Sequence, residues 1–203
     1  MPRVLVVFLL LVAMGGCGRR ASDTPVADEP AVEHSGLAGS LTGESLDAFD
    51  STFTDQSGHT VTLASYHGRP MVLAMIYTHC TSACPLLLNS LRRLETALPA
   101  AQRADTWFVL VTLDPAHDPP DTLRAFAASR GLDLARWRLL RGSREATTEL
   151  AAILGVKVRE EADGPIAHSS NLYLLDSQGV IRYTVAGLGT DPTAMVPARA
   201  ALR

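Results

Sequence analysis

The chain has 203 residues, of which 47% are hydrophobic and 5% aromatic, and its formal net charge is -3. That length suits one domain with extensions, and the apolar content is enough for a buried, mainly aliphatic core. The mild negative charge leaves no basic surface for nucleic acid and indicates no polyanionic partner, so both classes are excluded.

An apolar run at residues 4–14 follows Arg3 near the start of the chain. A helix of this length would rise only about 16 Å, roughly half of a bilayer core, which is typical of a secretory signal and too short for a membrane span. The run ends in Met14-Gly15-Gly16-Cys17, which resembles a bacterial lipobox. We therefore predict a lipoprotein signal peptide at residues 1–16 and a lipid on Cys17. The alternative is a plain signal peptide cut nearby, and both interpretations export the protein.

Residues 17–44 are rich in Ala, Gly, Pro, Ser and acidic side chains and show no sustained apolar period. This composition predicts a flexible tether between the lipid and a folded domain, which we expect to cover residues 45–203. With Cys17 lipidated, the remaining thiols are Cys80 and Cys84. Because the predicted compartment is oxidising, a structural disulfide between these two cysteines is an alternative interpretation.

The predicted domain alternates apolar strands with amphipathic helices. A turn signal at residues 55–58 separates two short strands around Phe53 and Val61. Strands are predicted at 70–77, 106–113 and 137–140. Each is followed by a predicted helix, at about 82–98, 121–129 and 145–154 respectively. A closing hairpin is predicted at 171–176 and 180–185, and a last helix at 191–202. This order predicts an α/β, thioredoxin-like fold: a central mixed sheet, helices on both faces and an N-terminal β-hairpin.

The pair Cys80 and Cys84 follows the first buried strand and opens the next helix, at the sheet edge where α/β folds place their chemistry. A helix that begins at Ser82 or Ala83 leaves Cys80 in the preceding loop and puts Cys84 in the first turn, so both thiols face one spot. The positive end of the helix dipole favours the thiolate, which is both a nucleophile and a metal ligand. The spacing alone therefore leaves a disulfide, a thiol catalyst and a metal site open.

Two thiolates and one imidazole suit Cu(I) and can also hold Cu(II). The candidate third ligand among the six histidines is His168, because it precedes the closing hairpin, opposite the cysteine loop in a thioredoxin fold. The alternative is an ordinary loop histidine. His79 is disfavoured because consecutive residues of an extended segment point in opposite directions, and His117 because it lies in a proline-rich turn. Asp114, at the end of the second buried strand, is a candidate to orient the site or to cap a turn.

Four stretches together resemble the SCO/SenC family of thioredoxin-fold proteins. They occur in family order and cover most of the predicted domain: DSTFTDQSGHTVTL (50–63), MIYTHCTSACPLL (75–87), VLVTLDPAHDPPDTLRAF (109–126) and AHSSNLYLLDSQGVI (167–181). The resemblance implies a protein that binds one copper ion, as Cu(I) or Cu(II), and helps to build the CuA centre of cytochrome c oxidase. It implies Cys80, Cys84 and His168 as the ligands and Asp114 as a supporting acid.

Between its cysteines the chain departs from many members of that family. They have Pro-Asp-Val or a similar sequence there, whereas this chain has Thr81-Ser82-Ala83. The missing acid removes a negative charge beside the thiolates and leaves the three expected ligands in place. The departure therefore bears on the choice of client protein rather than on the site.

The resemblance implies a metallochaperone that passes copper to an oxidase subunit or another copper carrier. Such a protein would be a monomer, held to the membrane by its N-terminal lipid and facing the periplasm. The alternative is a thiol–disulfide oxidoreductase in which Cys80 attacks and Cys84 resolves, acting on the CuA cysteines, so enzymatic activity stays open. A peroxiredoxin-like peroxidase is disfavoured because no arginine is clearly placed for it. A structural disulfide in a binding module would leave His168 and Asp114 unexplained.

Overall fold

The computed structural model describes residues 43–160 and 166–202. The predicted signal peptide, the lipidation residue Cys17 and nearly all of the predicted tether lie outside these ranges. Backbone pairing is present from Gly43 onward, because its N–H donates to the carbonyl of Ile181 at 2.8 Å and Ser45 forms an antiparallel bridge with Val180. Within the described ranges, no helix has the length and apolar character needed to cross a bilayer.

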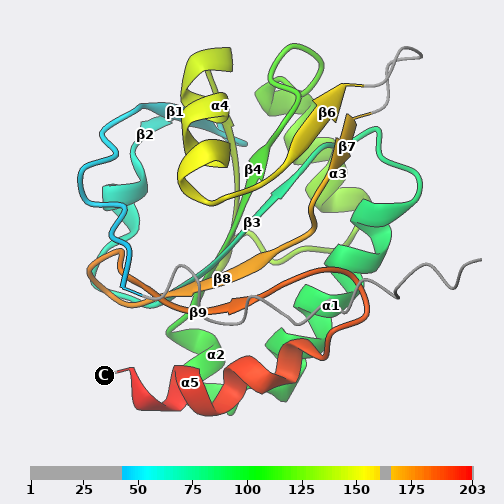
Figure 1. The fold of residues 1–203 in the computed structure, drawn as a ribbon. Helices are drawn as coiled ribbons and strands as arrows, with labels where there is room; N and C mark the ends of the chain where they lie inside the picture. Colours follow the sequence, from blue (N-terminus) through cyan, green and yellow to red (C-terminus); the bar gives the residue numbers. More distant parts are fainter. Residues whose placement is uncertain (1–42, 161–165, 203) are drawn as a thin grey trace, which may run out of the picture. The chain divides into compact units, whose positions relative to one another are not determined.

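The described residues form a seven-stranded mixed sheet at the centre of the domain (Figure 1). Its order is β2-β1-β5-β4-β3-β8-β9. The strands are β1 Phe53–Asp55, β2 Thr60–Val61, β3 Met71–Ile76, β4 Trp107–Thr112, β5 Trp137–Gly142, β8 Leu172–Leu175 and β9 Ile181–Val185. β3, β4 and β5 are parallel, whereas β8, β9 and the N-terminal hairpin pair antiparallel. The predicted thioredoxin-like α/β fold is confirmed.

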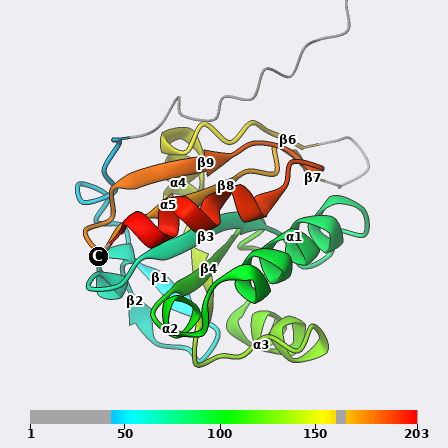
Figure 2. The same cartoon turned by 90° about the horizontal axis from the view of Figure 1, so that it is seen from below.

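Helices cover both faces of the sheet (Figures 1 and 2). One face carries α1 Ala83–Ala97, α3 Pro120–Ser129 and α5 Met195–Ala201, and the other carries α4 Arg144–Ile153. Shorter helices are η1 Leu63–Tyr66, α2 Ala100–Ala104 and η2 Pro192–Ala194. Helices α1 and α2 connect β3 to β4, and α3 connects β4 to β5, so the parallel strands are joined by βαβ connections.

The middle strand β3 explains why the sheet must be covered on both faces. Its alternate side chains divide between two core clusters: Val72, Ala74 and Ile76 pack with α1, and Met71, Leu73 and Met75 pack on the α4 side. All six residues are buried, which is the pattern of a central strand in an α/β fold. This uninterrupted apolar run is what made β3 predictable.

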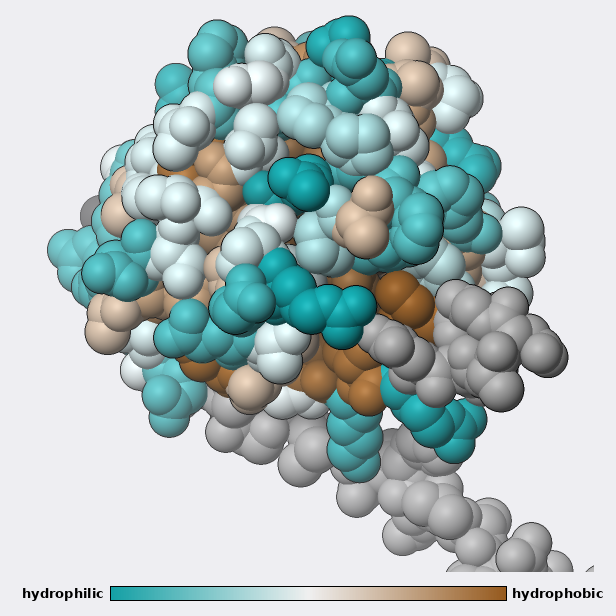
Figure 3. All heavy atoms as spheres, turned by 90° about the horizontal axis from the view of Figure 1, so that it is seen from above, coloured by the Kyte–Doolittle hydropathy of each residue, from teal (hydrophilic) through white to brown (hydrophobic). Residues whose placement is uncertain are grey.

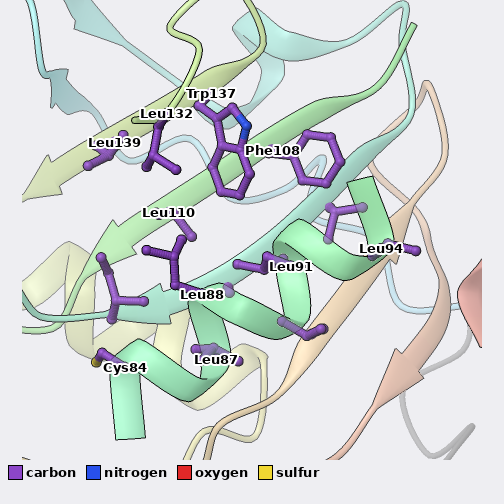
Figure 4. Packing of buried hydrophobic residues seen from close by; sticks show 14 of the residues in the cluster. Cys84, Leu87, Leu88, Leu91, Leu94, Phe108, Leu110, Leu132, Trp137 and Leu139 are labelled. Atoms are coloured by element: carbon purple, nitrogen blue, oxygen red, sulfur yellow. The ribbon is translucent and has the colours of Figure 1, made fainter. Parts of the chain in front are cut away.

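The core between α1 and the sheet fixes the helix that begins at the cysteines. Figure 4 shows leucines of α1 pointing toward β4 and β5, with Phe108 and Trp137 beside them. The rings of Phe108 and Trp137 stack with their centroids 4.8 Å apart. Cys84 lies at the start of the same helix face, so its position is set by the packing of the whole helix.

The structure contains a second, two-stranded sheet that was not predicted from the sequence. It pairs β6 Val158–Glu160 with β7 Ile166–His168 in antiparallel register. His168 is therefore the last residue of a strand, paired with Val158, rather than part of an open loop before β8. The two strands are too short to show a clear period-2 pattern, which is why the sequence did not reveal them.

Candidate metal centre

The two cysteines lie where β3 gives way to α1. Both side chains are buried, and both thiols are free. The backbone N–H of Cys84 donates to the sulfur of Cys80 at 3.2 Å, so the thiol in the loop is directed at the first turn of the helix. This is the arrangement that the spacing predicted, because α1 begins at Ala83.

The surroundings shift the pKa values of the two thiols in opposite directions. Burial by itself raises the pKa of Cys80, but the backbone N–H groups of Cys84 and Ser82 outweigh burial and lower that pKa to about 7. Burial raises the pKa of Cys84 to about 12, and the charges of Cys80 and Asp118 add to the rise. Near neutral pH, Cys80 is therefore the thiol with substantial thiolate character and Cys84 is protonated.

His168 faces this pair from the end of β7. Its Nε2 atom lies 3.9 Å from the sulfur of Cys84, and its Nδ1 atom lies 3.1 Å from the carbonyl oxygen of Ser169. A carbonyl can only accept, so Nδ1 carries the hydrogen and Nε2 presents its lone pair toward the thiol. Burial also lowers the pKa of His168, which keeps the ring neutral. Figures 1 and 2 both show β7 beside the segment that leads into α1.

The distance between these atoms suits a single ion. Metal–sulfur and metal–nitrogen bonds of about 2.3 and 2.0 Å, the lengths typical of zinc, add up to about 4.3 Å. The 3.9 Å between Cys84 Sγ and His168 Nε2 is shorter than that sum, so one ion can contact both atoms. In the described part of the chain, no group of three or more His, Cys, Asp or Glu side chains is arranged to hold a metal as it stands. A metal that bound Cys80 as well would therefore draw the three side chains closer together.

A family profile decides where this chain belongs. The profile of SCO1/SenC matches residues 43–201, which includes both cysteines and His168. The chain belongs to the SCO1/SenC family. This confirms the resemblance that the four sequence stretches indicated, and it agrees with the position of the free thiols at the start of α1.

Two curated relatives accompany the SCO1/SenC assignment. The SCO1 protein homolog of Bacillus subtilis (strain 168) is 28% identical over 144 residues, which span 70% of this chain and 74% of the relative. A Stutzerimonas stutzeri protein, provisionally named for copper binding, is 32% identical over 136 residues, which span 63% of each chain.

Solved structures of the SCO1/SenC family share the fold. BsSco, described as a member of the Sco family of cytochrome c oxidase assembly proteins with a disulfide switch, has a TM-score of 0.64 and 26% identity. The match covers 75% of this chain and 92% of BsSco. ScoI of Bradyrhizobium japonicum with copper bound has a TM-score of 0.62 and 22% identity, covering 80% and 99% of the two chains. At that identity the likeness is one of fold.

The three residues between the cysteines of this SCO1/SenC chain act on Cys80 through a backbone N–H group rather than through a side chain. Ser82 is the N-cap of α1 and its side chain makes no capping hydrogen bond. Its backbone N–H instead lowers the pKa of Cys80. The segment Thr81-Ser82-Ala83 therefore supplies Cys80 with a hydrogen-bond donor and brings no acid to the site.

Asp114 lies at the end of β4, as predicted, but its carboxylate is occupied by a turn. The N–H of His117 donates to Asp114 Oδ1 at 3.3 Å, and Nδ1 of His117 lies 2.9 Å from both carboxylate oxygens. These contacts are those of the turn-capping alternative. The role of Asp114 as a supporting acid stays a prediction.

Asp118 is a functional candidate that the sequence analysis missed. It is fully buried and accepts hydrogen bonds from the backbone N–H of Thr78 at 3.0 Å and from the hydroxyls of Thr78 and Thr112. This network ties the cysteine loop to the end of β4, and the charge of Asp118 acts on Cys84. The signal was present in the DPAHDPP stretch, where a second acid stands directly before a proline pair.

A cavity of about 510 Å³ lies near this site without containing the thiols. The turn after β4, α4 and the β6–β7 hairpin surround it, and both Asp114 and Ile166 line it. Cys80, Cys84 and His168 are not among its described lining residues. This cavity is therefore separate from the two thiols and from His168.

Proposed function

We propose that this chain is a metallochaperone that binds one copper ion and delivers it to the CuA site of cytochrome c oxidase. Cys80, Cys84 and His168 would be the ligands. The observation that carries the proposal is the Nε2 atom of His168, whose lone pair faces the sulfur of Cys84 at 3.9 Å while Nδ1 contacts the carbonyl of Ser169. An oxidoreductase has no need of an imidazole in that position.

Membership of SCO1/SenC supports the same function. The name of the Stutzerimonas stutzeri relative and the copper-bound ScoI structure point to copper, and the description of BsSco points to oxidase assembly. Two thiolates with a neutral imidazole are a donor set suited to Cu(I) and able to hold Cu(II).

The residues of the site define how copper would enter and leave. Cys80 provides a thiolate near neutral pH, whereas Cys84 must lose a proton when it binds the metal. His168 contributes a neutral nitrogen without proton loss. With three protein ligands, an incoming thiolate or imidazole of the acceptor can join the ion before a ligand of this chain leaves.

We infer the location of the protein from its N-terminal sequence. We propose that Cys17 carries lipid after removal of residues 1–16, and that residues 17–44 let the domain reach away from the membrane. The domain would act as a monomer in the periplasm. Its acceptor would be a copper-binding oxidase subunit or another copper carrier.

The second candidate function is thiol–disulfide exchange. The low pKa of Cys80, the buried neutral thiol of Cys84 and the disulfide switch named for BsSco favour it. The Cys80 thiolate would attack a client disulfide and release one client thiolate. Deprotonated Cys84 would then attack the sulfur of Cys80 and release the second, which leaves the client reduced and the Cys80–Cys84 pair oxidised. Copper can bind only the reduced pair, so the two functions are compatible.

One assay separates the two functions. Copper-loaded protein is mixed with an apo CuA domain, and the absorption of the CuA centre is followed. His168→Ala is expected to abolish copper transfer while leaving disulfide exchange with a model disulfide unchanged. Transfer by His168→Ala at the wild-type yield would exclude this histidine as a ligand. If Cys84→Ser still transferred copper but failed in disulfide exchange, the two roles would be separate, with Cys84 needed for the redox chemistry and not for copper transfer.

A further inference from the structure

Two exposed histidines lie against each other beside the cysteine loop. His79 follows β3 and His117 follows β4, and because these strands are neighbours their carboxyl ends meet at one edge of the sheet. The two rings stand edge to face at 85°, with their centroids 6.2 Å apart. Their side chains are 60% and 71% exposed. The function proposed above uses neither residue.

The surroundings of both rings leave the same nitrogen bare. Nδ1 of His117 lies 2.9 Å from both oxygens of the Asp114 carboxylate, which can only accept, so Nδ1 carries the hydrogen. Nδ1 of His79 lies 3.3 Å from the hydroxyl oxygen of Thr78 and 3.6 Å from Asp118 Oδ1. The Thr78 hydroxyl donates to Asp118, so it accepts from His79. The nitrogen that each ring can offer to a metal is therefore Nε2.

We propose that His79 and His117 form a second metal site, which binds Cu(II) through the two Nε2 atoms. Imidazole is a good ligand for copper, and Cu(II) stands highest among the divalent first-row ions in affinity for nitrogen sites. Histidines that bind metals typically donate their other ring hydrogen to a carboxylate or another oxygen, which is the arrangement of both rings here. Two bonds of about 2.0 Å require the nitrogens to stand no more than about 4 Å apart, which exposed rings with centroids 6.2 Å apart can reach by side-chain rotation.

The position of this pair gives it a role. His79 directly precedes Cys80 in the chain, so an ion held by the histidine pair would be bound beside the loop that carries the thiols. Figure 3 looks onto the domain from above the view of Figure 1 and shows mostly hydrophilic side chains around a smaller apolar area. The pair would capture copper from solvent and pass it to the thiols. This relay rests on the proposed function, whereas the metal site itself does not.

His59 offers a matched control on the same domain. Its Nδ1 atom lies 3.3 Å from the Asp55 carboxylate, and its side chain is 76% exposed. It is thus a solvent-facing histidine with a carboxylate on Nδ1, like His117. Among the described ring contacts, none joins it to a second histidine. His59 therefore tests whether one such histidine is enough.

The test uses the full chain carrying Cys80→Ser and Cys84→Ser, which removes the thiols of the first site. Cu(II) is titrated into it and followed by calorimetry and by electron paramagnetic resonance. We expect one tight equivalent with hyperfine splitting from two nitrogens. His79→Gln or His117→Gln should each weaken binding by about tenfold or more, the range seen when the surroundings of a metal site are lost. The double variant should be little weaker than either single one, because the two rings act as a unit.

Three results would overturn the proposal. The first is an unchanged affinity for Cu(II) in both single variants. The second is a loss of affinity in His59→Gln as large as in His117→Gln. The third is additive losses of affinity in the double variant.

The relay is tested in the wild-type cysteine background, where the double variant His79→Gln with His117→Gln should slow copper loading of the thiols without changing their final occupancy. An unchanged loading rate would refute the relay. Failure of copper binding by the wild-type thiols, with Cu(II) binding intact in the serine variant, would instead refute the proposed function.

Discussion

Cys80 and Cys84 are separated by three residues, yet their chemistry is set by different neighbours. Backbone N–H groups at the start of α1 lower the pKa of Cys80 to about 7, and burial raises that of Cys84 to about 12. Alkylation requires the thiolate. We therefore expect iodoacetamide to modify Cys80 first, with a rate that rises with pH to a plateau above about pH 7.

Mass spectrometry of samples quenched between pH 5 and 9 measures this prediction. Cys84→Ser serves as the control, because Cys80 keeps its backbone donors in that variant and its midpoint should stay below the ordinary thiol value. Preferential modification of Cys84, or a midpoint near 9 for Cys80, would contradict the assignment of the two thiols.

The same shifts predict how copper affinity depends on pH. Above about pH 7, Cys80 is already a thiolate and copper must displace one proton, from Cys84. The binding constant should then rise about tenfold per pH unit, because metal binding is coupled to proton release. Below about pH 7, both thiols are protonated and the rise should steepen to about a hundredfold. Competition with a Cu(I) chelator at several pH values measures the slope, and a flat profile would contradict thiolate ligation.

Among the elements, the cysteine loop is fixed to β4 by Asp118. Asp118→Ala leaves the Thr78 amide and the hydroxyls of Thr78 and Thr112 without their acceptor. Each buried donor left unpaired costs about 1–3 kcal/mol, so we expect a loss of unfolding free energy on the order of 3 kcal/mol. For a domain of this size that lowers Tm by about 6–12 °C, and copper affinity should fall with it.

Asp121→Ala is the matched control for this prediction. It removes an exposed acid three positions further on, which pairs with Arg124 on the surface of α3. Exposed pairs and first-turn acids contribute at most about 1 kcal/mol, so calorimetry should show a small change. Equal losses in the two variants would show that Asp118 does not hold the loop.

Helix α1 positions Cys84 through its buried face. Leu91→Ala removes a fully buried side chain from the core against the sheet, and such truncations cost about 2–5 kcal/mol. Leu86→Ala makes the same substitution on the same helix at a side chain that is 56% exposed, and it should change stability by no more than about 0.5 kcal/mol. Urea unfolding monitored by circular dichroism compares them, and similar midpoints would contradict the assigned face.

The elements that could be predicted from sequence are those with a long apolar pattern. β3, β4 and α1 each bury a continuous run or a regular stripe, so their type and position were predictable. The short helix α2 and the β6–β7 hairpin were not, because they are brief and bury little. Their conformation depends on the tertiary structure around them, and the pattern of apolar residues within a short segment does not contain that information.

At the scale of the whole molecule, the sequence predicted those site residues whose position depends only on the strand and helix next to them. The place of Cys80 and Cys84 at a strand end and a helix start was predictable, whereas His168 as a ligand depended on resemblance to a family. The contact between His79 and His117 joins residues from two separate loops. The buried state of Asp118 depends on the packing of β3 against β4. Such contacts arise from how the strands are ordered in space.

The central claim is that Cys80, Cys84 and His168 together bind one copper ion. Anaerobic titration of the reduced protein with Cu(I), against a competing chelator, tests it most directly. We predict one tight equivalent in the wild type and in His59→Ala, and a fall in affinity of more than about a hundredfold in His168→Ala, beyond the loss typical of an outer-shell change. An unchanged affinity in His168→Ala, or no tight copper in the wild type, would contradict the account.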